Sequence, residues 1–156
     1  MLHVSEQMTD LFEWNKKEYI FIGASDVYKL FDPEEYGLKP TAPHTACWKG
    51  FIIHFAVRKG QLYLDKLEVN CANGIYPVIN RVKAKDKTKE SSFHVYNKLK
   101  MPLRYTGTIM IGKNLFAGSR NRTFFGRYSY DYIYELEFEK GILLDFKETS
   151  NTYHRF

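Results

Sequence analysis

The stretch HTACWKGFIIHF, residues 44–55, concentrates the side chains that could carry out covalent chemistry. His44 precedes Cys47 by three positions, which can place an imidazole beside a thiolate, and His54 or His94 could orient the pair from elsewhere in the fold. This pattern is typical of a cysteine-dependent enzyme centred on Cys47 and His44. The alternative is that Cys47 opens a mostly apolar strand, where a free cysteine behaves as a small hydrophobic residue. We favour the strand and expect Cys47 to be buried.

The sequence contains no other signature of catalysis or metal binding. A metal site needs three or four clustered ligands, and neither a CxxC nor an HxxxH pair occurs. GxSxG, GxxxxGK[ST] and GxGxxG, the marks of hydrolases, P-loop proteins and dinucleotide-binding proteins, are absent. Glu34 and Glu35 lie in a predicted turn, and Glu135, Glu137 and Glu139 alternate along a predicted solvent-facing strand. We therefore predict a protein that is not an enzyme and uses no metal or cofactor.

The distribution of charge is more informative than any motif. Residues 81–127 contain twelve lysines and arginines against two acids, whereas the segments on either side carry a slight excess of acids. The predicted binding residues of this segment are Arg81, Lys83, Lys85, Lys87, Lys89, Arg120, Arg122, Phe124, Phe125 and Arg127. The first five occupy every second position, so an extended backbone would present them on one side, where they could contact phosphates or an acidic protein surface.

Two binding hypotheses and one structural explanation fit these residues. Arginines that bracket Phe124 and Phe125 are typical of proteins that bind single-stranded nucleic acids. A lysine row also protects an exposed sheet edge from aggregation, and phenylalanines also fit a core. The partner is therefore an acidic protein surface or, as the alternative, RNA or single-stranded DNA. We prefer the protein partner, because the regular alternation of the tyrosines from residue 128 onward predicts that they pack in the core, which leaves few aromatic rings on which bases could stack.

The composition predicts a mainly β fold that positions these residues. Aromatic residues make up 17% of the 156 residues, with 12 Tyr and 12 Phe, and such side chains suit half-buried sheets. LFEW and EYIFIG around a polar turn predict two short strands, and Ser25 and Asp26 are the candidate N-caps of one helical turn. Pro40 and Pro43 predict a loop over residues 37–46. We expect one antiparallel domain, a sandwich or partly open barrel of seven to ten strands with one or two short helices.

Two similar hairpins stand out in this pattern. HFAVRKGQLYLD and ELEFEKGILLDF align so that Gly60 matches Gly141, and apolar residues alternate on both sides of each Lys-Gly pair. We predict type I turns closed by Gly60 and Gly141 at positive φ, and we expect Trp48 to be buried before the first hairpin. The second hairpin has a predicted core face that comprises Tyr128, Tyr130, Tyr132, Tyr134, Leu136 and Phe138, with Ile133 as an exception on the acidic face. YTGTIMIG from Tyr105 predicts a further strand.

The motif TACWKGF, followed by a strand, a Lys-Gly turn and LYL, resembles an uncharacterised family of small bacterial proteins. Their pattern is Thr-Ala-x-Trp-basic-Gly-aromatic, then a TGxLxI-like strand and a terminal YE strand, which match TACWKGF, TGTIMI and YELEFEKG here. The resemblance covers roughly residues 18–146 and implies a bacterial origin without an established activity. Residues 75–100 have no counterpart in it.

The sequence also predicts where the protein works. No run approaches the roughly 18 apolar residues of a membrane span, and the first residues do not resemble a signal peptide. Two cysteines form no disulfide framework. We therefore expect a cytoplasmic protein of residues 1–156, with a polar basic loop or ribbon near residues 81–92 and no membrane contact. The predicted function is macromolecule binding, as an immunity-type or accessory module.

Overall fold

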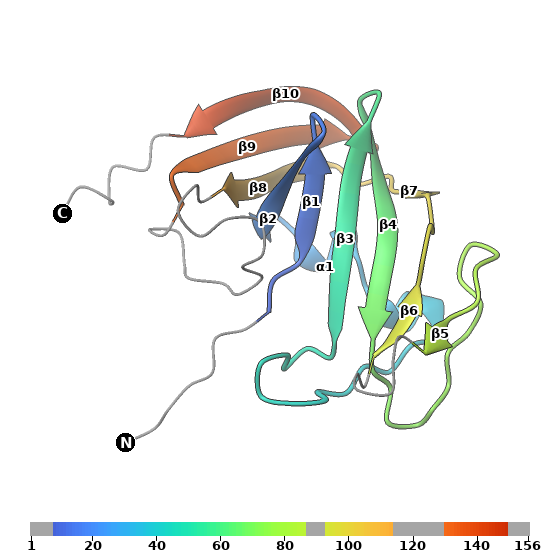
Figure 1. Ribbon diagram of the computed structural model, residues 1–156. Coiled ribbons are helices and arrows are strands. Elements are labelled where there is room, and N and C mark those ends of the chain that lie inside the picture. Colours follow the sequence, from blue (N-terminus) through green and yellow to red (C-terminus); the bar gives the residue numbers. More distant parts are fainter. Residues whose placement is uncertain (1–7, 87–92, 114–129, 150–156) are drawn as a thin grey trace, which may run out of the picture.

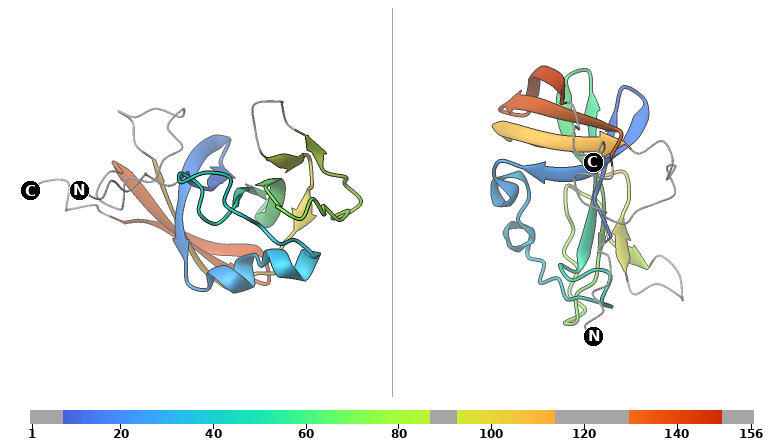
Figure 2. Two further views of the ribbon diagram at one scale, coloured as in Figure 1. Left: turned by 90° about the horizontal axis from the view of Figure 1, so that it is seen from below. Right: turned by 90° about the vertical axis from the view of Figure 1, so that its left-hand side faces the viewer.

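The chain forms a mainly antiparallel sheet that curls into a barrel (Figure 1). The computed structural model describes residues 8–86, 93–113 and 130–149. The strands are β1 (Leu11–Trp14), β2 (Lys17–Ala24), β3 (Phe51–Arg58), β4 (Gln61–Val69), β5 (Lys85–Asp86), β6 (His94–Tyr96), β7 (Met101–Pro102), β8 (Gly107–Lys113), β9 (Tyr132–Glu139) and β10 (Ile142–Thr149). A short helix, α1 (Val27–Leu30), and a 3-10 turn, η1 (Pro33–Tyr36), follow β2 and lie against the barrel (Figure 2). The predicted mainly β fold is confirmed.

Among the described residues, seven strands close the barrel in the order β10-β9-β8-β2-β1-β3-β4. Neighbouring strands are antiparallel except β1 and β3, which are parallel. The ring closes where Ile142 of β10 pairs with Gln61 of β4. β6 pairs with the far end of β4, and β5 pairs with β6 and ends the strand order. No helix in the described ranges is long and apolar enough to cross a membrane.

Two-residue turns join the hairpins of the barrel. Lys59 and Gly60 connect β3 to β4, Lys140 and Gly141 connect β9 to β10, and all four residues have positive φ. Positive φ at both central residues defines the type I′ turn, whose twist matches that of the flanking strands. The predicted positive φ of Gly60 and Gly141 is confirmed. The predicted type I turn is wrong, because each lysine is also left-handed.

The two Lys-Gly hairpins meet at the seam that closes the barrel. The Leu62 amide donates to the Gly141 carbonyl at 2.8 Å, and the Leu143 amide donates to the Gly60 carbonyl at 2.8 Å. These four residues occupy matching positions in the two aligned sequences, so the exchange of hydrogen bonds is nearly symmetric. The similarity between the hairpins therefore marks the two sides of the closure.

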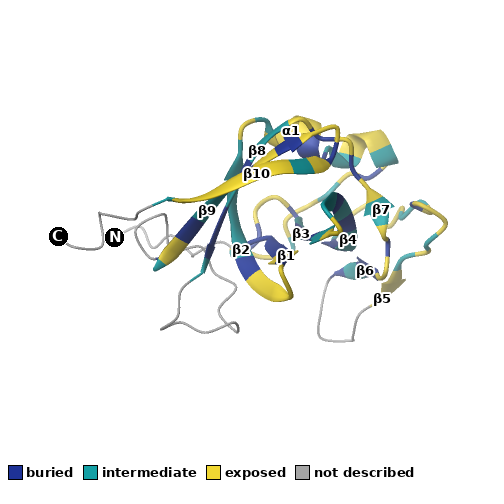
Figure 3. Ribbon diagram, turned by 90° about the horizontal axis from the view of Figure 1, so that it is seen from above, coloured by how far each residue is buried: buried dark blue, intermediate teal, exposed yellow. Residues whose placement is uncertain are grey.

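The barrel interior is filled by aromatic and branched side chains. Phe12, Phe55, Leu64 and Ile109 are at most 2% exposed and belong to one continuous core. Strand β10 contributes little to that core, and Figure 3 shows it as a largely exposed ribbon. The barrel is thus packed at its centre, while β10 lies open to solvent along most of its length.

The alternation along β9 is only partly as predicted. Phe138 is buried in the core, but Tyr132, on the same predicted face, is 39% exposed, and Tyr128 lies outside the described residues. Ile133, expected to be a lone exception on a solvated face, is fully buried. Its partner across the strands is Gly112, and the Tyr130 ring lies against Gly112. The outer face of β9 is therefore covered at Ile133, whereas Tyr132 on the inner face is exposed at the mouth of the barrel.

Candidate functional site

Cys47 lies in a turn four positions before the first residue of β3, not within a strand. Its side chain is 2% exposed, and its thiol donates a hydrogen bond to the Phe51 carbonyl at 3.8 Å. Burial raises the pKa of the Cys47 thiol, which keeps the thiol protonated at neutral pH. A nucleophilic cysteine needs the opposite shift. The predicted burial of Cys47 is confirmed.

The histidines make contacts that do not serve a thiolate. The Ala46 amide donates to Nδ1 of His44 at 3.3 Å. His54 Nε2 lies 2.8 Å from a carboxylate oxygen of the buried Glu68, and His94 Nε2 lies 3.2 Å from Asp86.

The prediction that the neighbouring Trp48 is buried is wrong. Its side chain is 60% exposed, because the motif precedes the strand as a surface turn.

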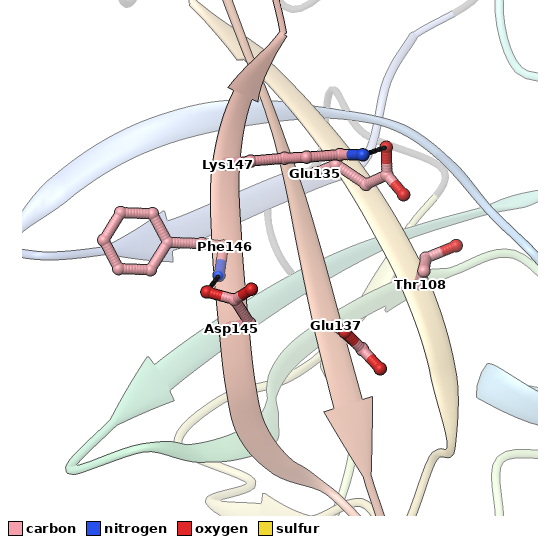
Figure 4. A pocket seen from close by; sticks show the side chains of 6 residues that line it. All are labelled: Thr108, Glu135, Glu137, Asp145, Phe146 and Lys147. Carbon is pink, nitrogen blue, oxygen red and sulfur yellow. Dashed lines mark hydrogen bonds and ion pairs between the residues drawn. The ribbon is translucent and has the colours of Figure 1, made fainter.

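The outer face of β8, β9 and β10 carries a shallow acidic hollow (Figure 4). Its volume is about 120 Å³, and it is lined by Thr108, Glu135, Glu137, Asp145, Phe146 and Lys147. Lys147 pairs with Glu135 at 3.8 Å, and the Phe146 ring points away from the other side chains. In the described part of the chain, no group of three or more acidic, histidine or cysteine side chains could hold a metal ion. We interpret the hollow as part of a solvent-exposed strand face.

The basic residues of the predicted site that the structure describes are Arg81, Lys83 and Lys85. All three are exposed, while Val82 and Ala84 between them pack against the core. Lys87, Lys89, Arg120, Arg122, Phe124, Phe125 and Arg127 lie outside the described residues. Exposed cations therefore alternate with packed residues from Arg81 to Lys85, where the end strand β5 begins, and residues 87–92 of the predicted loop or ribbon lie outside the described residues.

A two-residue turn brings further cations to this region. Ile79 and Val82 exchange backbone hydrogen bonds of 2.8 and 3.0 Å across Asn80 and Arg81. The Asn80 side-chain amide donates to the Leu99 carbonyl at 2.7 Å, which fixes the turn against residues 98–100. Lys98 and Lys100, on either side of Leu99, are both exposed. We call Arg81, Lys83, Lys85, Lys98 and Lys100 the basic surface.

Three members of the basic surface have an unfavourable backbone conformation. Arg81, Lys98 and Lys100 have φ of 67°, 52° and 46°. The left-handed region costs a residue with a side chain roughly 1–2 kcal/mol relative to glycine, and such strain often accumulates at functional sites. None of these cations takes part in an ion pair within the ranges that the structure describes. Within those ranges, no acidic side chain pairs with their charges.

Apolar side chains lie beside the basic surface. Ile75 and Val78, in the loop before Asn80, are 57% and 58% exposed. Sequence reasoning missed both, together with the position of Lys98 and Lys100. The segment NGIYPVIN gave a usable signal, because Pro77 within its apolar run disfavours both a helix and a central strand, so these residues lack an obvious place in the core.

Comparison with known proteins gives no further assignment. No family model, curated protein or solved structure matches this chain. The resemblance of the TACWKGF motif to small bacterial proteins therefore stays a prediction, and the function must be inferred from the site itself.

Proposed function

We propose that the protein is a non-enzymatic binding module that contacts an acidic surface of another protein through the basic surface. The observation that carries this proposal is the set of exposed cations around the Asn80–Leu99 contact, which form no ion pair with the described residues. Three of them are held in left-handed backbone at positions where glycine would be more stable. Because Lys59 and Lys140 in the hairpin turns share this conformation, it is the grouping of five cations on one exposed surface that supports a role in binding.

The neighbouring side chains favour a protein over a nucleic acid. Proteins that bind single strands offer exposed aromatic faces on which bases stack. Within the described residues of 70–100, the large exposed hydrophobic side chains are the aliphatic Ile75 and Val78. Tyr96 is fully buried, and the Tyr76 ring is stacked on His94 at 3.8 Å. An apolar centre with a polar, charged rim is the usual composition of a protein interface.

The proposed setting is the bacterial cytoplasm, where the protein acts as an immunity-type or accessory partner. The resemblance of its tryptophan motif to small bacterial proteins supports this setting. Both Cys47 and Cys71 are free and buried, which suits a reducing compartment. An inhibitory partner commonly covers a charged surface by electrostatic complementarity, which speeds association.

A pair of glycine substitutions separates binding from stability. In a Lys98→Gly, Lys100→Gly variant, relief of the left-handed backbone should leave the melting temperature equal or higher. Loss of two interface charges should slow association about tenfold or more at low salt. The measurements are affinity capture from host lysate, with bound protein quantified by mass spectrometry, and then kinetics with the purified captured partner.

The chain offers a matched control for these variants. Lys59 and Lys140 are also exposed left-handed lysines, but they lie in the hairpin turns near the barrel seam. Lys59→Gly, Lys140→Gly removes the same charges with the same relief of strain and should keep full partner capture. Equal loss in both double variants would show that net charge alone matters. Nuclease treatment that abolishes capture would instead support RNA or single-stranded DNA as the partner.

A further inference from the structure

A cavity of about 380 Å³ opens at the mouth of the barrel, distant in sequence from the basic surface. It is lined by Lys17 and Tyr19 of β2, Lys113 of β8, and Tyr132 and Tyr134 of β9. Barrel mouths and cavities of roughly 300–1,000 Å³ are frequent binding sites for small molecules. We call this the tyrosine–lysine cavity.

The strand register explains why these side chains converge. Lys113 pairs with Tyr132, and Ile111 pairs with Tyr134, so both pairs share one face of the sheet. Ile111 is fully buried in the core. The cavity is therefore the continuation of the barrel interior beyond its last packed layer. Strand pairing thus fixes the positions of these lining residues.

Packed aromatic rings form one wall of the cavity. Tyr19 and Tyr134 meet edge to face with ring centroids 5.8 Å apart, and the buried Trp14 meets Tyr134 edge to face at 5.3 Å. Tyr132 is 39% exposed and borders the opening. Burial, followed by the neighbouring Tyr134, raises the pKa of Tyr19, so its phenol stays protonated. The rings thus offer a fixed apolar wall with hydroxyl donors.

The charges of the cavity select the sign of a ligand. Among the described residues, its lining holds two ammonium groups and no carboxylate, and neither lysine forms an ion pair there. Glu148 lies opposite Tyr134 in the register and is exposed at the rim. An anionic group near Lys17 and Lys113 would gain charge-assisted contacts, while a flat ring would pack against the tyrosines.

We propose that the tyrosine–lysine cavity binds one small planar aromatic anion. The site is independent of the proposed protein interface, because the two share no residue. The class includes aromatic sulfonates, aromatic carboxylates and nucleoside monophosphates. Size and charge both restrict the occupant: the volume suits one small ligand, and an uncharged ring would leave both ammonium groups without a partner.

Two dyes with the same rings test the proposal. 8-Anilinonaphthalene-1-sulfonate carries the anion, and N-phenyl-1-naphthylamine lacks it. The titrations use a Trp48→Phe background, so that emission comes from Trp14 against the cavity wall. We expect saturable binding of one sulfonate dye, with affinity about tenfold lower for each of Lys17→Gln and Lys113→Gln as a charged contact is lost. The neutral dye should bind weakly, and its affinity should be the same in the parent and in both lysine variants.

Controls make each outcome decisive. Lys16→Gln removes the charge next to Lys17 in the chain but outside the lining, and it should leave sulfonate binding unchanged. Tyr132→Ala should weaken both dyes. Adenosine monophosphate should compete with the sulfonate, whereas adenosine should not. The proposal is overturned by an absence of saturable binding, by equal affinity for the two dyes, or by insensitivity to both cavity lysines in variants with unchanged circular dichroism.

Discussion

Gly60 and Gly141 occupy matching positions in two similar hairpins, yet the structure makes their substitution by alanine unequal. Both glycines have left-handed φ, of 76° and 86°. A Cβ at Gly60 would meet nothing within 4 Å. A Cβ at Gly141 would overlap the Leu103 carbonyl oxygen and approach Gln61 Nε2 to 2.8 Å. Gly141→Ala therefore requires the backbone at the seam to move.

The hydrogen bonds at the seam give the size of the difference. Alanine in left-handed backbone costs roughly 1–2 kcal/mol, and the lower entropy of the unfolded chain returns about 0.4–1 kcal/mol, so Gly60→Ala should cost about 1 kcal/mol. Movement of Gly141 also strains two hydrogen bonds of 2.8 Å. The Gly141 amide donates one to the Tyr105 carbonyl, and the Gly141 carbonyl accepts the other from the Leu62 amide. At roughly 1 kcal/mol for each bond, plus repulsion, Gly141→Ala should cost about 3–5 kcal/mol.

Thermal melts followed by circular dichroism measure both effects. For a chain of this length, about 1 kcal/mol shifts the melting temperature by about 2–4 °C. Gly60→Ala should therefore lower it by a few degrees, and Gly141→Ala by about 10 °C or more. Equal shifts for the two variants would refute the close packing of Leu103 and Gln61 against Gly141, because the unequal shifts are predicted from that packing.

Three further outcomes follow from buried polar groups. Cys47 and Cys71 should react with Ellman's reagent only after unfolding, and Cys47→Ala should cost about 1 kcal/mol; fast reaction of folded Cys47 would revive the enzyme hypothesis. Burial raises the pKa of Tyr96 to about 12, so its contribution to stability is complete below pH 10 and is lost as the pH rises to 12. In urea titrations over this pH range, Tyr96→Phe should flatten the fall in the free energy of unfolding. Asp10 accepts hydrogen bonds from the Ile53 amide at 2.8 Å and from Lys49 at 2.5 Å. Asp10→Ala should therefore lower the free energy of unfolding by about 2–4 kcal/mol, and an unchanged urea midpoint would contradict both contacts.

Part of the candidate site was predictable because it depends on local pattern. Cations at every second position predict that Arg81, Lys83 and Lys85 share one side of an extended chain. All three are exposed while Val82 and Ala84 pack against the core, but Arg81 lies in a left-handed turn and not in an extended segment. Lys98 and Lys100 could not be assigned to the same surface from sequence. Their proximity depends on the hydrogen bond between Asn80 and Leu99, residues 19 positions apart, which no periodicity encodes.

By itself, the sequence determined what neighbouring residues can specify: the β class, the hairpins, the glycines of their turns and the burial of Cys47. Alternating apolar residues and Lys-Gly pairs act over a few residues, so their signal survives without knowledge of the fold. Tertiary structure alone decided that the two hairpins pair with each other, that Trp48 lies outside the core, and that Tyr132 opens onto a cavity. These features depend on which distant strands become neighbours and where the barrel ends. Both follow from the packing of the whole chain, because a strand buries or exposes a face only against the partner that it finds.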